Sequence, residues 1–182
     1  MIIKFELSSE RLCLRPLSDV NMQALFAVFS DPRVMRYGST PAWDSFSKAE
    51  DKILRNRRGV ESGESMCLAI FHRDDFRFLG TVDLFQIDVQ CRRAELGYTL
   101  AFEAWGQGYM AEALTTLLDH AFAELAFNRI EADIDPRNAT SIACLERLGF
   151  QREGLLRQRW IIEDEVSDSA IYGLLREEWI AR

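Results

Sequence analysis

A chain of 182 residues, of which 48% are apolar, is long enough to fold as one domain around a sizeable hydrophobic core. Its net charge of −7, from 29 acidic and 22 basic side chains, argues against nucleic acid as the main ligand. No stretch reaches the roughly 18 consecutive apolar residues of a membrane helix, so no membrane partner is expected. The cysteines are widely spaced and form no zinc-ligand pattern with the two histidines, which predicts reduced thiols, no bound metal and a cytoplasmic location. They are Cys13, Cys67, Cys91 and Cys144.

The N-terminal quarter predicts one strand and two helices. Residues 11–17 alternate between apolar and polar side chains, as a strand does. Apolar residues at helical spacing fill 22–29, and Asp19 is in position to cap that helix. A second helix is expected to begin at Ser47, because Ser47 and Glu50 match the capping-box spacing.

Three strand-like segments follow, at residues 66–71, 79–85 and 93–100. Their short connections predict an antiparallel meander. In the third segment Ala94 and Leu96 share an apolar face with later residues, while Glu95 belongs to the opposite face.

A turn with two glycines, residues 105–109, comes directly before a long amphipathic helix. Gly106 and Gly108 remove side chains from this turn, and Met110 begins the apolar stripe of the helix. Free backbone N–H groups and the helix dipole at such a start attract an anion, most often a phosphate. The alternative is a tight turn without a ligand, and the glycines alone do not decide between the two.

The strand at 130–134 returns after this helix, so a right-handed crossover predicts that it runs parallel to 93–100. Asn138 then caps a shorter helix, which Gly149 ends. Two more strands, at 154–162 and 168–175, complete the pattern.

These elements predict a single domain over residues 1–182. Its fold class is α+β, with three layers: a mixed, mostly antiparallel sheet of about seven strands and helices on both faces.

Taken together, the segments resemble the GNAT acyltransferase superfamily, and within it the Rim-like branch that acetylates the N-termini of ribosomal proteins. The similarity spans essentially the whole chain, with five motifs in the family's order. They are the opening from Ser9 to Leu17, the strand from Arg93 to Tyr98, the turn from Trp105 to Tyr109, the run from Asn138 to Phe150, and the ending from Leu174 to Trp179.

The resemblance implies acetyl-CoA, or a close acyl-CoA, as co-substrate. Its pyrophosphate would lie on the backbone N–H groups from Gln107 to Met110, and its pantetheine arm would run beside 93–100, where that strand diverges from 130–134. The backbone of Thr99 and Leu100 would bind the amides of the arm. The full set of expected cofactor-binding residues is Thr99, Leu100, Gly106, Gln107, Gly108, Tyr109, Met110, Asn138 and Ser141.

The chain departs from the superfamily pattern at two positions. Met110 is bulkier than the glycine or alanine that is common there, which does not matter if its side chain turns into the core. Leu145 holds the position of a tyrosine that protonates the leaving thiolate in many members. Ser141 is the nearest hydroxyl, so it is expected to act as the acid or to hydrogen-bond the sulfur; the alternative is an ordinary first-turn serine.

Glu95 is the first candidate for a general base that acts on the amine through water. The alternative is a surface glutamate, or one paired with Arg93. Asp83 and Asp168 are second candidates for the base, and Cys144 is expected to be a core residue.

The predicted function is transfer of an acetyl group from acetyl-CoA to a primary amine by direct attack in a ternary complex. A protein N-terminus is one candidate acceptor, and a polyamine, an amino acid or an aminoglycoside is another. A non-catalytic acyl-CoA-binding module is a third reading. The acceptor is expected to lie against the loop from Tyr37 to Trp43 and against Trp160, and the protein is expected to be a monomer or homodimer.

Overall fold

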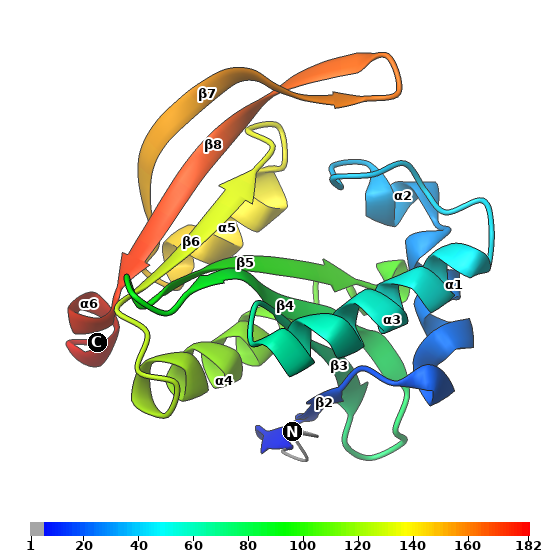
Figure 1. The fold of residues 1–182 in the computed structure, drawn as a ribbon, viewed down its shortest axis with the longest axis horizontal. Coiled ribbons are helices and arrows are strands. Elements are labelled where there is room, and N and C mark those ends of the chain that lie inside the picture. The colour runs from blue at the N-terminus through cyan, green and yellow to red at the C-terminus, as the bar shows by residue number, and fades with distance from the viewer. Residues whose placement is uncertain (1–5) are drawn as a thin grey trace.

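The computed structural model describes residues 6–182, whose eight strands form one sheet with helices on both faces (Figure 1). Neighbouring strands follow the order β1-β2-β3-β4-β5-β6-β8-β7. The predicted three-layer α+β fold is confirmed, with one very short strand more than the seven expected. The strands are β1 (Leu7–Ser8), β2 (Leu12–Pro16), β3 (Met66–His72), β4 (Phe78–Asp88), β5 (Arg93–Leu100), β6 (Arg129–Ile134), β7 (Gln151–Ile162) and β8 (Glu165–Leu175). The helices are α1 (Met22–Phe29), α2 (Pro32–Met35), α3 (Ser47–Ser62), α4 (Tyr109–Ala123), α5 (Ala139–Arg147) and α6 (Arg176–Ile180), with 3-10 turns η1 (Asp19–Asn21) and η2 (Phe102–Ala104).

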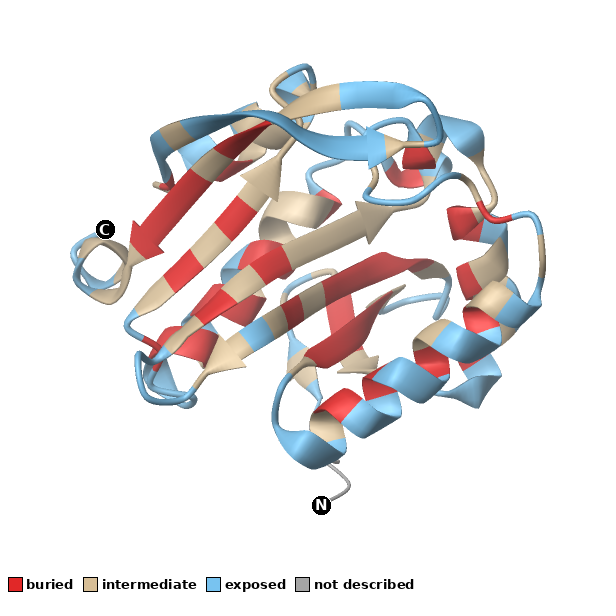
Figure 2. Cartoon of the chain, turned by 45° about the horizontal axis from the view of Figure 1, so that its top comes forward, coloured by how far each residue is buried: buried red, intermediate tan, exposed pale blue. Residues whose placement is uncertain are grey.

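The β5–β6 pair is parallel, as the helical crossover predicts, and the other strand pairs in the described chain are antiparallel. The register of the parallel β5–β6 pair covers only three residue pairs, from Arg93↔Arg129 to Glu95↔Glu131. Beyond them β5 stays with β4, and β6 follows β8 as far as Ile134. Figures 1 and 2 show the two strands diverging. We call this divergence, beyond Glu95 and Glu131, the β5–β6 fork.

Two hydrophobic clusters hold the helices on the sheet (Figure 2). In the larger cluster, Leu117 of α4 and Leu145 of α5 are fully buried against one face. In the smaller, Leu25 of α1 and Ile53 of α3 are buried against the other. The sheet is therefore the middle layer, with α4 and α5 on one side and α1 and α3 on the other.

Two of the predicted helix caps are wrong, although the second helix does begin at Ser47 as expected. Asn21 Oδ1 accepts a hydrogen bond from the Ser18 N–H at 3.0 Å, so the cap residue is Ser18, and Asp19 is already the first residue of η1. Ser47 is already the first residue of α3, because the backbone of Phe46 before it is helical (φ −63°, ψ −27°). Ser47 therefore cannot occupy the cap position that the capping box requires.

Both predicted boundaries of α5 are confirmed. The Asn138 side-chain oxygen accepts a hydrogen bond from the backbone N–H of Ser141 at 3.2 Å, as an N-cap does. Gly149 follows the helix with φ +90°, a conformation that glycine adopts without steric cost.

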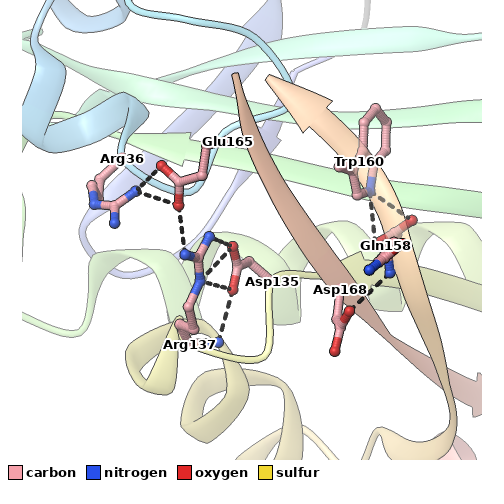
Figure 3. Close-up of polar contacts among 8 residues, drawn as sticks. Arg36, Asp135, Arg137, Gln158, Trp160, Glu165 and Asp168 are labelled. Atoms are coloured by element: carbon pink, nitrogen blue, oxygen red, sulfur yellow. Dashed lines mark hydrogen bonds and ion pairs between the residues drawn. The ribbon is translucent and has the colours of Figure 1, made fainter. Parts of the chain in front are cut away.

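The hairpin of β7 and β8 is longer than predicted and contains a bulge, at which the residues from Arg157 to Arg159 lie opposite Asp168 alone. Gln158, at the middle of the bulge, has φ +53°, and its N–H donates to Asp168 Oδ1 at 2.8 Å (Figure 3). Bulges bend a strand and increase its twist. The hairpin curves over the end of β6 toward α2 (Figure 1).

Candidate active site

The glycine turn before α4 has the geometry expected of an anion site. Gly106 and Gly108 have φ of +72° and +79°, in the left-handed region that favours glycine. Gly108 is the N-cap of α4, and the first backbone bond of the helix runs from the Glu112 N–H to the Gly108 carbonyl at 3.2 Å. The N–H groups of the preceding residues are therefore outside the helical ladder, at the positive end of the helix dipole. Met110 packs against the larger cluster, so its side chain turns into the core. This is the condition under which its bulk, the departure from the family pattern, does not matter.

Arg11 holds this turn in place, a role that the sequence did not predict. Its Nε contacts Glu112 Oε2 at 2.6 Å, and its Nη1 donates to the Gln107 carbonyl at 3.0 Å. Its guanidinium also lies 4.6 Å from the centre of the Tyr109 ring. Glu112 accepts a further bond from Ser9 Oγ at 2.6 Å. The sequence signal for this role is the place of Arg11 in the opening motif of the family. Its partners, Gln107 and Glu112, lie about 100 residues further along the chain, so the contact itself could not be predicted.

Beyond Glu95, β5 runs along the fork toward the glycine turn. Thr99 and Leu100 are half-buried there, and they pair with Thr81 and Gly80 of β4. The Leu100 carbonyl already accepts a hydrogen bond from Trp105 Nε1 at 2.8 Å. Trp105 thereby ties the end of β5 to the glycine turn.

Ser141 and Leu145 lie on α5 as predicted, Ser141 in its first turn. Ser141 is half-buried, whereas Leu145 is fully buried in the core. The side-chain oxygen of Asn138 is engaged in the helix cap. Cys144 is partly buried, and burial raises the pKa of its thiol, which agrees with a packing role and an uncharged state at neutral pH.

Carboxylates gather on the face of β5 and β6 that points away from α4. Glu95 and Glu131 are side by side in the parallel register, and Asp133 is two residues further along β6. Burial raises the pKa of Glu95, and the negative charges of Asp133 and Glu131 raise it further. Arg93 pairs with Glu131 at 3.1 Å, so the expected alternative of an Arg93–Glu95 ion pair is wrong.

The second candidates for the base have other contacts. Asp83 pairs with Lys52 at 3.0 Å, and Asp168 caps the bulge at Gln158. In the described structure, Glu95 is thus the candidate whose carboxylate is not used to hold another element.

The expected acceptor wall is only partly formed. Trp43 is buried and stacks on Phe29, with ring centroids 4.5 Å apart, so it packs in the core and does not line a site. Trp160 donates from Nε1 to Asp133 Oδ2 at 3.3 Å. Asp133 also accepts a hydrogen bond from Ser169 Oγ, and it forms an ion pair with Arg159 at 3.1 Å.

Four charged side chains join three loops near this carboxylate face (Figure 3). Glu165, at the start of β8, pairs with Arg36 at 3.2 Å and with Arg137 at 2.5 Å. Asp135 holds Arg137 at 2.5 Å, and Tyr37 lies under both guanidinium groups. We call Arg36, Asp135, Arg137 and Glu165 the clasp. It connects the hairpin tip to the end of α2 and to the β6–α5 loop.

None of the described helices is long and apolar enough to span a membrane. Among the described residues, no group of three or more His, Cys, Asp or Glu side chains is arranged to hold a metal ion.

Comparisons with known proteins identify the family. The acetyltransferase (GNAT) domain matches residues 11–151. The chain is 35% identical over 174 residues to p20 of Bacillus licheniformis, an uncharacterised N-acetyltransferase, covering 95% of this chain and 97% of p20. It is 25% identical to the [ribosomal protein uS5]-alanine N-acetyltransferase of Escherichia coli, covering 97% and 93% of the two chains.

A solved structure agrees with the fold. The spermidine N-acetyltransferase of Vibrio cholerae, in complex with CoA and spermine, superposes with a TM-score of 0.84 at 20% identity, over 94% of this chain and 99% of that one. The chain therefore belongs to the GNAT family and is an acyl-CoA-dependent N-acetyltransferase with Rim-like relatives.

Proposed function

We propose that acetyl-CoA lies in the β5–β6 fork and gives its acetyl group directly to a primary amine that approaches from the carboxylate face. The observation that carries this proposal is the position of the fork: β5 loses its second strand partner after Glu95 and leads to the glycine turn of α4. A pyrophosphate on the N–H groups from Gln107 to Met110 places the pantetheine arm along Thr99 and Leu100. Trp105 already occupies the Leu100 carbonyl, which leaves the other backbone groups of the strand for the arm.

Attack requires the unprotonated amine. At pH 7, deprotonation costs about 1 kcal/mol for an N-terminal amine, compared with about 4.6 kcal/mol for a lysine side chain. Glu95 accepts the proton through a water molecule, and its raised pKa makes it a better base than an ordinary glutamate. Backbone N–H groups of β5 stabilise the tetrahedral oxyanion. The C–S bond then breaks, and Ser141 stabilises the departing sulfur with its hydroxyl hydrogen.

We propose a protein N-terminal amine as the acceptor. Its low pKa suits a carboxylate base, and the uS5-alanine acetyltransferase resembles this chain over 93% of its length. The carboxylate face attracts the ammonium form of any acceptor. Spermidine is the second candidate, since the structurally similar Vibrio enzyme binds spermine and CoA. We also propose a cytoplasmic location, which agrees with the free thiols of the buried residues Cys13 and Cys67. The proposed oligomeric state is a monomer or a homodimer.

The test is release of free CoA thiol from acetyl-CoA with a panel of amines. The panel pairs an alanine-first peptide with its N-formylated form, and adds spermidine, free amino acids and an aminoglycoside, with mass spectrometry to locate the acetyl group. Thiol release with the free peptide and none with the formylated one supports an N-terminal acceptor. Preference for spermidine overturns that acceptor but leaves the reaction class intact.

Kinetics with both substrates varied test the direct attack. Intersecting reciprocal plots support a ternary complex, whereas parallel plots indicate an acetylated enzyme intermediate and overturn the mechanism.

A further inference from the structure

Lys52 is a mostly buried cation that reaches from α3 to the sheet beside the β5–β6 fork. Its Nζ lies 3.0 Å from Asp83 Oδ1, and the two side chains are only 20% and 19% exposed. The same Nζ is 5.4 Å from the centre of the Phe29 ring. Burial lowers the pKa of Lys52, but the carboxylate of Asp83 outweighs burial and holds that pKa above its usual range. The ammonium group therefore keeps its charge at neutral pH.

This ammonium group has more hydrogens than its partner accepts. A lysine ammonium can donate three hydrogen bonds. Among the described residues it donates one, to Asp83 Oδ1. The other oxygen of that carboxylate, Oδ2, accepts a hydrogen bond from Thr81 Oγ1 at 3.3 Å. The two remaining N–H groups of Lys52 are thus available to water or to a ligand.

The strand register places this ion pair next to the proposed base. Asp83 lies opposite Gly97 of β5. Two residues further along β4, Phe85 lies opposite Glu95. Asp83 and Glu95 are therefore diagonal neighbours on one face of the sheet, with Cα atoms about 7–8 Å apart. Gly97 puts no side chain between them, and a Cβ added there would lie 3.7 Å from the Asp83 Cβ. Lys52 and Glu95 thus border the same region of the sheet.

The unused N–H groups favour one class of acceptor. A peptide N-terminus carries its amine next to the carbonyl oxygen of the same residue, so the amine can lie at Glu95 while the oxygen accepts from Lys52. A polyamine such as spermidine has further ammonium groups and no oxygen. It would leave the N–H groups of Lys52 without an acceptor, and a site built to donate a hydrogen bond discriminates against a ligand that lacks the acceptor.

We propose that Lys52 donates a hydrogen bond to the carbonyl oxygen of the acceptor's first residue and so selects a peptide N-terminus over a polyamine. The inference rests on the proposed function, in which the α-amino group lies at Glu95. Asp83 is a positioning residue: its carboxylate already holds the ammonium group in place, so the long lysine side chain does not have to be ordered when the acceptor binds. Lys52 determines specificity and takes no part in proton transfer.

The test compares acceptors in the double variant Lys52→Met/Asp83→Asn, which removes the donor without leaving a buried carboxylate unpaired. For an alanine-first peptide, KM is expected to rise about 10–100-fold, the effect of losing one hydrogen bond to a charged group. For isopropylamine, in which a methyl group replaces the carbonyl, kcat/KM is expected to stay at the wild-type value. For spermidine it is expected not to fall. The comparison between acceptors is decisive because misfolding lowers the activity toward all of them alike.

Arg57→Met is the matched control. It removes another cation from α3, one that pairs with Asp19 at 3.0 Å, and it is expected to change the kinetics of neither the peptide nor isopropylamine. Equal losses for the peptide and for isopropylamine in the double variant would overturn the inference and leave the proposed function standing. An unchanged KM for the peptide would do the same.

A binding measurement separates the inference from the proposed function. Calorimetric titration of the alanine-first peptide into the CoA-loaded enzyme requires no turnover. If no amine releases thiol, the proposed function fails, and the dissociation constants still decide the inference. A wild-type value at least about tenfold lower than that of the double variant supports the hydrogen bond from Lys52. Equal values, or no binding to the wild type, reject it.

Discussion

Glu95 combines two effects that usually accompany a working carboxylate base. It is partly buried, and it lies on the same face as Glu131 and Asp133 without an ion pair of its own among the described residues. Both the burial and the neighbouring negative charges raise its pKa. Such a group binds a proton more readily than a solvated glutamate and is destabilising to the fold when ionised.

Replacing Glu95 with Gln removes the proposed base. We expect kcat/KM for the acceptor to fall about 10²–10⁴-fold, the usual contribution of general base catalysis, with little change in acetyl-CoA affinity. Steady-state kinetics and isothermal titration with acetyl-CoA measure the two effects. Glu131→Gln on the same face is the control, because the carboxylate of Glu131 is held in ion pairs by Arg93 and Arg129 and is not the proposed base. Full activity in Glu95→Gln would eliminate this residue as the base.

The pH dependence follows from the sign of the shift. A base works only when it is deprotonated, so kcat/KM is expected to rise with pH through the raised pKa of Glu95. Of the two carboxylates that raise this pKa, Asp133 has the larger effect, and Asp133→Asn therefore lowers that pKa and moves the acidic limb of the profile to lower pH. An acidic limb that stays in place in Asp133→Asn would show that another group limits the rate.

At the scale of elements, the start of α4 is defined by the glycine turn and by the bonds of Glu112 with Ser9 and Arg11, which lie between β1 and β2. The backbone of Gly106 has φ +72° in open space, so a side chain there meets strain but no clash. Gly63, after α3, has nearly the same geometry, with φ +78° and no atom within 4 Å of an added Cβ. The two glycines thus differ in position and not in local conformation.

Gly106→Ala and Gly63→Ala form a matched pair. Each is expected to lower the free energy of unfolding by about 1–2 kcal/mol, the cost of a left-handed backbone at alanine. Only Gly106→Ala is expected to weaken acetyl-CoA binding, because it alone disturbs the proposed pyrophosphate turn. Urea unfolding and isothermal titration give the two numbers. Equal acetyl-CoA affinity in both variants would place the phosphate elsewhere.

Glu112 joins the first turn of α4 to the N-terminal strands. Burial would raise its pKa, but hydrogen bonds from Ser9 and Arg11 outweigh burial and lower it. The resulting stability is present above the unfolded-state pKa and is lost as the pH falls through the lower folded-state pKa. Glu112→Gln is expected to lower the free energy of unfolding by about 1–2 kcal/mol at pH 7 and by less in acid. This range allows for solvent screening on the exposed side of Arg11. Urea unfolding at two pH values measures this, with Glu124→Gln at the exposed end of α4 as control; equal costs at both pH values would contradict it.

Local signals in the sequence predicted the parallel β5–β6 pair, the glycine turn and the cap at Asn138, because each depends on neighbouring residues or on a connection rule. Cap positions failed where one residue's backbone decided the boundary, as at Phe46 before α3. Trp43 was predicted to line the acceptor site because an aromatic residue in a loop looks the same in sequence whether it packs or binds; its burial became visible only in three dimensions.

At the scale of the whole molecule, the least predictable feature is the clasp. Arg36 and Glu165 are 129 residues apart, and nothing local to either indicates the other. Their contact depends on the bulge at Gln158, which bends the hairpin toward α2. No local pattern in the sequence indicates a three-residue bulge opposite Asp168, so the reach of the hairpin could not be predicted from the sequence.

The clasp predicts an effect on the acceptor and not on the fold. The side chains of Arg36, Arg137 and Glu165 are about half exposed, and such pairs contribute only about 0–1 kcal/mol, so Glu165→Gln is expected to leave the melting temperature nearly unchanged. Freed from Arg36 and Arg137, the hairpin tip is held less firmly over the carboxylate face, and KM for the acceptor is expected to rise several-fold while KM for acetyl-CoA stays constant. Because exposed ion pairs are screened by salt, raising the salt to about 0.5 M should bring the wild type close to the variant. Asp19→Asn, which removes the similarly exposed Arg57 pair far along the chain, is the control and should change neither KM. Parallel salt responses in the wild type and in Glu165→Gln would show that the clasp has no part in acceptor binding.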